Sequence, residues 1–194
     1  MNPNEDDILL WKQYQQGNEA AFGRIFIRLY PSLFQFGCKI TQHTEILEDC
    51  IQELFTELWH NKSQSDVQSV KAYLLKSLKY KLLRVLSKKA MVSASETENI
   101  YGFELSHESL LIIDEENKAQ KDRVLKAFGQ LSSRQKEIIY LKFYQELSYE
   151  EISEVMNINY QVSRNLLYQA IKALKKIMTE AALALLIQFA VHSS

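Results

Sequence analysis

Hydrogen-bonding and cationic side chains gather at the start of a helix that the sequence predicts from Tyr160 to beyond Lys176. They are Tyr160, Gln161, Ser163, Arg164, Asn165 and Tyr168, with Lys172, Lys175 and Lys176 further along. Arginine and glutamine can make paired hydrogen bonds to guanine and adenine edges respectively, and lysines suit backbone phosphates. The pattern indicates a helix whose N-terminal end reads duplex DNA.

A short helix must hold this reader helix in place, and the segment Tyr149–Met156 has a suitable length. Ser148 and Glu151 have the spacing of a capping box. Leu147 and Ile152 stand at the two positions of a hydrophobic staple. Two local devices therefore predict the same helix start.

The turn between the two helices also has fitting residue types. Asn157 tolerates left-handed backbone, Asn159 can cap the reader helix, and Ser153 is small enough for a close approach. We expect Ile158 and Val162 to be buried between the helices. These features predict a helix-turn-helix motif; the alternative is an antiparallel helical hairpin with an incidental polar face.

Two further helices are expected before this motif. The first is amphipathic and spans Asp122–Gln130. Its apolar residues are Val124, Leu125 and Phe128. The second begins at a capping box formed by Ser132 and Gln135 and runs to about Tyr144. Its expected core residues are Ile138, Ile139, Leu141 and Phe143.

In the first half of the chain, the segment Thr44–Asn61 predicts a helix with two contrasting faces. The apolar face consists of Leu47, Cys50, Ile51, Leu54, Phe55 and Leu58. The opposite face consists of Glu48, Asp49, Gln52, Glu53, Thr56 and Glu57. A solvated surface is the default interpretation of such an acidic face. The functional interpretation is a docking site for a basic partner.

A polar loop, Asn61–Ser69, leads into a basic helix expected from Val70 to about Met91. Its charges are Lys71, Lys76, Lys79, Lys81, Arg84, Lys88 and Lys89, with Tyr73 and Tyr80 among them. Its core side consists of Leu74, Leu75, Leu78, Leu82 and Val85. Such a helix can hold phosphates and stack on unpaired bases; an ordinary solvated lysine face is the alternative.

The chain begins with further helical patterns. Asp6 or Asp7 can cap a first helix, and Gly17 can end it. A second helix is expected over about Glu19–Tyr30, after which Pro31 starts a new helical segment, since its missing N–H costs nothing there.

Composition narrows the protein class. With five Gly and two Pro in 194 residues, the chain is expected to be all-α, and the net charge of −1 is unusual for a free-standing DNA-binding protein. Cys38 and Cys50 are expected to be free in a reducing cytosol. No signal peptide is seen, and the apolar run 181–191 is too short to span a bilayer. No catalytic or metal motif is present, so we expect neither an enzyme nor a cofactor.

Four motifs, taken in order, resemble a known family. They are EAAFGRIFIRLYPSLFQFG, EDCIQELFTELW, the basic helix from Lys71, and LSSRQKEIIYLKFYQELSYEEISEVMNI. The first three resemble region 2, and the last resembles region 4, of sigma-70 family sigma factors in the extracytoplasmic-function (ECF) group, and the chain resembles the type common in Bacteroidetes. The resemblance covers about Glu19–Lys176.

The resemblance implies two helical domains joined by an acidic linker. We expect a region 2-like domain at 1–92, the linker at 93–117, a region 4-like helix-turn-helix domain at 118–178 and an apolar helical tail at 179–194. The linker would run toward the RNA exit channel of the polymerase. The tail would pack on the second domain or bind an anti-sigma factor.

The resemblance also implies roles for named residues in a cytoplasmic transcription factor that binds core RNA polymerase, promoter DNA and an anti-sigma factor. The candidate contacts to core polymerase are Asp49, Gln52, Glu53 and Leu58. The candidates for melting and reading the −10 element are Lys76, Lys79, Tyr80 and Arg84. The helix Tyr160–Lys172 would read the −35 element. We further expect the free protein to bind promoters poorly until the polymerase positions its DNA-binding faces.

Two other interpretations of the sequence stay open. A helix-turn-helix transcriptional regulator without sigma activity would leave the acidic and basic helices of the first half unexplained. A helical adaptor with no DNA role would have no effect at promoters.

Overall fold

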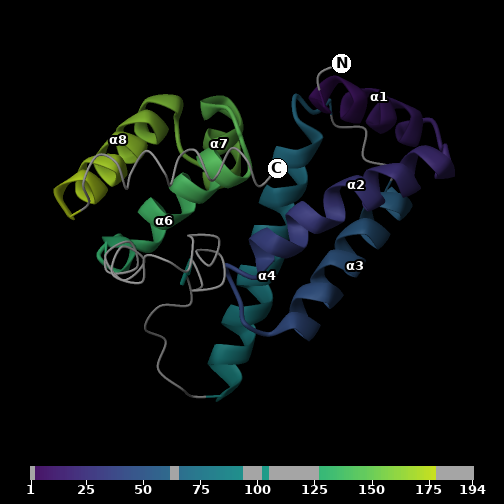
Figure 1. Ribbon diagram of the computed structural model, residues 1–194. Coiled ribbons are helices and arrows are strands. Elements are labelled where there is room, and N and C mark those ends of the chain that lie inside the picture. Colours follow the sequence, from purple (N-terminus) through teal and green to yellow (C-terminus); the bar gives the residue numbers. More distant parts are fainter. Residues whose placement is uncertain (1–2, 62–65, 94–101, 105–126, 178–194) are drawn as a thin grey trace, which may run out of the picture. The chain divides into compact units, whose positions relative to one another are not determined.

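The computed structural model describes residues 3–61, 66–93, 102–104 and 127–177 (Figure 1). Every regular element within those ranges is helical, which confirms the prediction of an all-α protein. The chain divides into two compact units, Met1–Gly102 and Phe103–Ser194, which we call unit 1 and unit 2. Within the described ranges, no helix is long and apolar enough to cross a membrane.

Unit 1 is a bundle of four helices: α1 (Pro3–Gln15), α2 (Glu19–Gly37), α3 (Thr44–Asn61) and α4 (Val70–Ser93). α2 packs against each of the other three helices, and α3 also packs against α4 (Figure 1). The bounds of α3 agree with the sequence prediction, and all six residues of its predicted apolar face are buried. α4 ends two residues beyond the predicted Met91.

Aromatic side chains join α1, α2 and α3 in the core of unit 1. Tyr14 of α1 lies with its ring centroid 5.2 Å from Phe22 of α2, and Phe22 lies 5.1 Å from Trp59 of α3. The Tyr14 hydroxyl donates a hydrogen bond to the carbonyl oxygen of Leu58. Burial of large rings with a satisfied hydroxyl stabilises this three-way junction.

The start of α1 differs from the prediction. Neither Asp6 nor Asp7 caps the helix, because it begins at Pro3 and both carboxylates lie inside it. Proline is favoured in a first turn, where its missing N–H has no helical partner anyway. Asp7 instead faces α2, where its Oδ1 lies 3.2 Å from Nε of Arg28. Gly17 follows the helix end with a φ of 90°, as expected of a terminating glycine.

Pro31 was also expected to begin a new helical segment, and this prediction is wrong. α2 is continuous from Glu19 to Gly37, with Pro31 inside it. Proline removes the hydrogen bond to the carbonyl four residues earlier, that of Ile27. Both residues lie on the exposed side of the helix, so water can replace the missing bond.

Unit 2 contains helical residues at 127–129, followed by α6 (Ser133–Ile139), the π-helix η3 (Tyr140–Tyr144), α7 (Tyr149–Met156) and α8 (Tyr160–Ile177). α8 packs against both α6 and α7. Of the amphipathic helix predicted at 122–130, Phe128 is described and buried, whereas Val124 and Leu125 lie outside the described residues. The tail from Thr179 also lies outside them.

The helix that begins at Ser133 runs to Tyr144 as predicted, but its last five residues form a π-helix. The N–H of Gln145 donates to the carbonyl of Tyr140, five residues earlier, at 3.1 Å. The wider turn changes which residues face the core. Tyr140 is buried, whereas Phe143, which was predicted to fill the core, is half-buried.

Candidate nucleic-acid interface

Both capping boxes predicted in unit 2 are present. The Ser132 hydroxyl accepts from the N–H of Gln135, and the Gln135 side chain accepts from the N–H of Ser132. At α7, the Glu151 carboxylate accepts from the N–H of Ser148 at 2.7 Å, and the Ser148 hydroxyl accepts from the N–H of Glu151 at 3.2 Å. Each box satisfies two N–H groups that a helix end leaves open. The start of the motif is therefore fixed by local sequence.

The turn between α7 and α8 has the predicted geometry. Asn157 adopts the left-handed conformation with a φ of 51°. The N–H of Ile158 donates to the carbonyl of Ser153 at 3.0 Å, which closes the end of α7. The side chain of Asn159 accepts from the N–H of Val162 at 2.8 Å and caps α8. The dimensions are those of a helix-turn-helix motif.

Two serines hold the helices of the motif together. The hydroxyl of Ser153 on α7 lies 3.2 Å from that of Ser163 on α8, so Ser153 does allow the predicted close approach. Ser163 also donates to the carbonyl of Tyr160 at 2.7 Å and has no exposed surface. Ser163 therefore does not lie on the face that could meet DNA, and we remove it from the candidate −35 contacts.

The exposed face of α8 carries the other candidate −35 contacts. They are Tyr160, Gln161, Arg164, Asn165, Tyr168 and Lys172, all exposed. The Arg164 guanidinium carbon lies 5.9 Å from the ring centroid of Tyr160, a cation–π distance. Gln161 Nε2 lies 3.5 Å from Asn165 Oδ1. These contacts pre-orient polar groups on a surface that is open to a ligand.

The buried side of α8 faces its own unit through Leu167, Ala170 and Leu174. Val162 was predicted to be buried between the two helices of the motif, and this prediction is wrong, since 43% of its surface is exposed. Ile158 is half-buried. The small, buried Ser163 lies against α7 instead, with its hydroxyl 3.2 Å from that of Ser153. The exposed Val162 therefore adds an apolar side chain to the face that carries Gln161.

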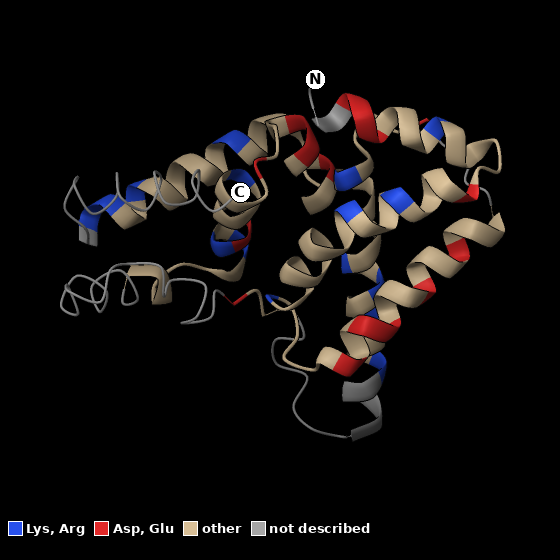
Figure 2. Ribbon diagram, turned by 45° about the vertical axis from the view of Figure 1, so that its right-hand side comes forward, with Lys and Arg blue, Asp and Glu red and all other residues tan. Residues whose placement is uncertain are grey.

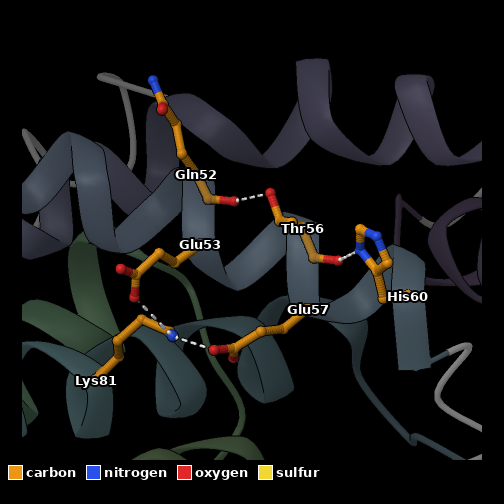
Figure 3. Close-up of polar contacts among 6 residues, drawn as sticks. All are labelled: Gln52, Glu53, Thr56, Glu57, His60 and Lys81. Atoms are coloured by element: carbon orange, nitrogen blue, oxygen red, sulfur yellow. Dashed lines mark hydrogen bonds and ion pairs between the residues drawn. The ribbon is translucent and has the colours of Figure 1, made fainter.

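The acidic face of α3 is closed on one side by a lysine from α4 (Figure 3). Lys81 Nζ lies 2.7 Å from Oε1 of Glu57 and 3.2 Å from Oε2 of Glu53. Burial alone would lower the pKa of Lys81, but the hydrogen bonds that it donates to Glu57 and Glu53, together with their charges, raise its pKa above the usual 10.5. The Lys81 ammonium group thus contacts two carboxylates that lie one helical turn apart. Without it, these two like charges would repel each other.

The candidate core-polymerase contacts differ in their exposure. Asp49, Gln52 and Glu53 are exposed, and together with Thr56 and Glu57 they line a shallow hollow on α3. Leu58 is buried, and its carbonyl accepts the hydrogen bond from Tyr14. Leu58 therefore belongs to the core of unit 1 and is withdrawn as a surface contact.

The candidate −10 contacts on α4 also divide. Figure 2 shows acidic residues along α3 and basic residues along α4. Tyr80 has 48% of its surface exposed and Arg84 is also exposed, whereas Lys76 is half-buried. Lys79 is buried, so it is not among the candidate −10 contacts that are exposed on α4. The predicted core side of α4 is buried, except for Val85, which is half-buried.

Among the ion pairs that sequence reasoning missed are the pairing of Lys81 with the acids of α3 and a second one in unit 2. Lys81 was grouped with the other lysines of its helix, and nothing in the sequence connects it with Glu53 or Glu57. The other pair joins Glu104, inside the predicted linker, to Lys136 of α6 at 2.8 Å. The i, i+4 spacing of Glu53 and Glu57 was a visible signal that some cation should lie between them.

Both cysteines carry free thiols, as expected, with Cys50 buried and Cys38 half-buried. Burial raises the pKa of both thiols above 9.0, which keeps them protonated and poorly reactive. Among the described residues, no group of three or more His, Cys, Asp or Glu side chains could hold a metal ion.

Comparison with known proteins places these features in a family. Residues 121–174, which include the whole helix-turn-helix motif, match the family "Sigma-70, region 4". The chain is similar to ECF RNA polymerase sigma factor SigK of Mycobacterium sp. strains JLS and KMS, at 25% identity over 89% of this chain and 90% of each relative. The match therefore extends across both units.

Two solved structures share the fold. CnrH, in complex with the cytosolic domain of CnrY, covers 88% of this chain and 96% of its own with a TM-score of 0.59. RpoE of Bartonella quintana, in complex with the anti-sigma factor NepR, covers 80% and 95% with a TM-score of 0.57. Both are 20% identical to this chain, so they inform the fold alone. The region 4 match, the SigK relatives and the capped helix-turn-helix together support a sigma-70 family sigma factor of the ECF group, which acts in transcription initiation.

Proposed function

We propose that this sigma factor divides promoter recognition between its two units, with α8 reading the −35 element and α4 contacting the −10 element. The observation that carries the proposal is the exposed polar face of α8, held on a helix-turn-helix motif by two side-chain caps. Gln161 and Arg164 are the proposed base readers, because their side chains can make paired hydrogen bonds to adenine and guanine. Lys172, two turns further on, is the proposed phosphate contact.

For the −10 element, the proposal relies on Tyr80 and Arg84. Both are exposed on α4, one turn apart, so an aromatic ring and a guanidinium face the same side of the helix. Aromatic side chains stack on unpaired bases, and arginine holds the phosphates of a single strand. Lys76, half-buried and one turn before Tyr80, extends the cationic surface.

For docking on core RNA polymerase, the proposal uses the exposed acidic face of α3. Asp49, Gln52 and Glu53 stand on one open side of the helix and fit a basic helical partner. The acidic face offsets part of the positive charge of α4, and the chain as a whole has a net charge of −1. We infer that the free protein binds promoters weakly and acts in the cytoplasm once polymerase holds it, with an anti-sigma factor as a further partner.

The experiment that tests the proposal is reconstitution with sigma-free core polymerase. The wild-type protein should direct initiation from specific sites in a library of genomic promoter fragments, and the free protein should show no tight, specific gel shift at physiological salt. A specific shift without initiation would indicate a regulator that lacks sigma activity. No effect on either readout would indicate an adaptor.

Matched variants separate docking from DNA reading. Asp49→Lys should lower the affinity for core polymerase, whereas Glu150→Lys, at an exposed acid on α7, should leave it unchanged. Arg164→Ala should leave core binding intact and reduce initiation. Equal loss of core binding in Asp49→Lys and Glu150→Lys would contradict the assignment of α3 as the docking helix.

A further inference from the structure

Val162 is the most exposed aliphatic residue among residues 160–176 of α8, with 43% of its surface open. Leu167 and Leu174 are buried, and Leu166 is half-buried. A single exposed valine is common on protein surfaces and carries no meaning by itself. What Val162 can do therefore depends on where the helix-turn-helix motif holds it.

Contacts at the start of α8 fix the position of Val162. It is the third residue of the helix, and its N–H donates to the Asn159 side chain at 2.8 Å. The neighbouring Ser163 faces α7, with its hydroxyl 3.2 Å from that of Ser153 and 2.7 Å from the carbonyl oxygen of Tyr160. These contacts resist rotation of the helix start about its axis. Because a β-branched side chain in a helix has one strongly preferred rotamer, the two methyl groups of Val162 are held in one direction.

Two amide side chains accompany these methyl groups on the exposed face of α8. Gln161 precedes Val162, and Asn165 follows it by three residues, a spacing that makes side chains neighbours on a helix surface. Gln161 Nε2 lies 3.5 Å from Asn165 Oδ1, and both residues are exposed. The start of α8 therefore presents an apolar group next to side chains that can each bond to an adenine edge.

Thymine offers the matching chemistry in duplex DNA, because it is the base that presents a methyl group in the major groove. Neighbouring bases along a strand are about 3.4 Å apart, and one helical turn rises about 5.4 Å. A helix end whose amide bonds to one base pair can therefore place a valine methyl group against an adjacent pair. Guanine or cytosine at that pair would bring a carbonyl oxygen or an amine against the methyl groups and lose hydrogen bonds to water.

We propose that Val162 is a specificity-determining residue that reads the C5-methyl group of one thymine in the −35 element. The methyl contact selects thymine at a base pair adjacent to the one that Gln161 reads. It adds a base preference that the hydrogen-bonding side chains of α8 do not supply. This inference rests on the proposed function, in which α8 enters the major groove at the −35 element.

The test replaces thymine by uracil, which differs from it only in lacking the C5-methyl group. Each thymine of the −35 element, on either strand, is replaced singly in a promoter from which the wild-type holoenzyme initiates. The affinity of the holoenzyme for each duplex is measured by titration. We expect one uracil substitution to weaken binding about fourfold, the effect of exposing one buried methyl group, and the others to change it less than about twofold.

Protein variants assign this uracil penalty to a side chain. Val162→Ala removes both γ-methyl groups and should abolish the penalty. Arg164→Ala should weaken binding overall and keep the full penalty, because effects at separate base contacts add independently. Ile27→Ala removes another exposed aliphatic side chain, on α2, and should change neither the affinity nor the penalty. Circular dichroism melts confirm that each variant is folded.

The outcomes separate this inference from the proposed function. If no uracil substitution weakens binding, or if the penalty is as large in Val162→Ala as in the wild type, Val162 reads no thymine. If Arg164→Ala and Lys172→Ala bind the promoter as tightly as the wild-type holoenzyme does, α8 does not read the −35 element and the proposed function itself fails.

Discussion

The ammonium group of Lys81 on α4 lies 2.7 Å from the carboxylate of Glu57 on α3, and it also reaches Glu53. This pairing joins the helix proposed to dock on polymerase to the helix proposed to contact the −10 element. Lys81 is the more buried partner, with 16% of its side chain exposed against 59% for Glu57. Lys81 therefore marks the side of the acidic face of α3 that lies against α4.

Replacing Lys81 should loosen this junction in a salt-dependent way. We expect Lys81→Met to lower the free energy of unfolding of unit 1 by up to about 1 kcal/mol at low salt, since both carboxylates are mostly exposed. Lys81→Arg should retain most of the stability. Trp11 and Trp59 are the two tryptophans of the chain and both lie in unit 1, so urea unfolding followed by tryptophan fluorescence reports on it. A difference that persists in 1 M salt would indicate packing of the lysine stem instead.

The stability that the Lys81 pairing contributes should be lost at alkaline pH. The pKa of Lys81 is raised above 10.5 in the folded protein, so the pairing contributes fully below that value and is lost as the pH rises through the raised pKa. The stability difference between wild type and Lys81→Met should therefore vanish at strongly alkaline pH. An unchanged difference there would contradict the role of the charge.

Asp7 should oppose folding at neutral pH. Burial raises its pKa above 3.8, although Arg28 acts in the other direction, so the folded state holds the Asp7 proton more tightly than the unfolded state. The stability that this group contributes is therefore greatest below pH 3.8 and falls as the pH rises through the folded pKa. Asp7→Asn should make unit 1 more stable than wild type at neutral pH, and the gain should shrink in acid.

The control for this prediction is Asp6→Asn, at the neighbouring and more exposed carboxylate. Guanidinium unfolding curves at several pH values measure both variants. The prediction fails if Asp7→Asn is less stable than wild type at neutral pH, because Arg28 would then outweigh the cost of burial.

Two glycines of α2 should respond in opposite ways to alanine. A Cβ on Gly37 would lie 2.1 Å from Cδ1 of Leu47, which is fully buried, whereas a Cβ on Gly23 would meet nothing within 4 Å. We expect Gly37→Ala to destabilise unit 1 by about 1–3 kcal/mol through overpacking. Gly23→Ala should stabilise it by up to about 1 kcal/mol through helix propensity. Tryptophan fluorescence in urea measures both, and equal effects would show that Leu47 moves aside.

The left-handed residue of the turn should tolerate glycine but not alanine. Asn157 has a φ of 51°, a conformation that costs most L-residues about 1–2 kcal/mol. We expect Asn157→Ala to speed amide hydrogen exchange in α7 and α8 about tenfold, and Asn157→Gly to leave it near wild type. Exchange that is equally fast in both variants would indicate that the Asn side chain, not the backbone conformation, holds the turn.

Base readers and phosphate contacts on α8 should differ in their effects on DNA binding. Arg164→Ala should reduce discrimination at one base pair by about 1–3 kcal/mol. Lys172→Ala should weaken binding to all sequences alike and reduce the salt slope of holoenzyme binding by about one unit. Titrations on promoter variants at several salt concentrations measure both. Uniform weakening by Arg164→Ala would show that it contacts the backbone instead.

Much of unit 2 follows from short-range rules, and the sequence therefore predicts it well. The capping box at Ser148, the left-handed Asn157 and the cap at Asn159 each depend on residues within three positions of one another. The α3 face was predictable for a similar reason, because the helical period alone sorts Leu47 and Leu54 from their polar neighbours.

The features that the sequence did not predict depend on contacts between distant segments. Pro31 stays inside α2 because the helix packs on three neighbours, which outweighs one lost hydrogen bond. Val162 is exposed because Ser163 takes the closest approach to α7. Leu58 and Lys79 became candidate contacts by resemblance, and their burial depends on how unit 1 packs.

The π-helix at 140–144 lies between the two capping boxes and contains one residue more than an α-helical turn would need there. A π turn holds one residue more than an α turn, and here it lies between helix starts that are each fixed by their own side chains. Loss of a single residue from Tyr140–Tyr144 could therefore be absorbed by tightening the turn into an ordinary α-helix. The segment just before the helix-turn-helix motif is thus a place where a change in chain length would leave α7 and α8 in register with each other.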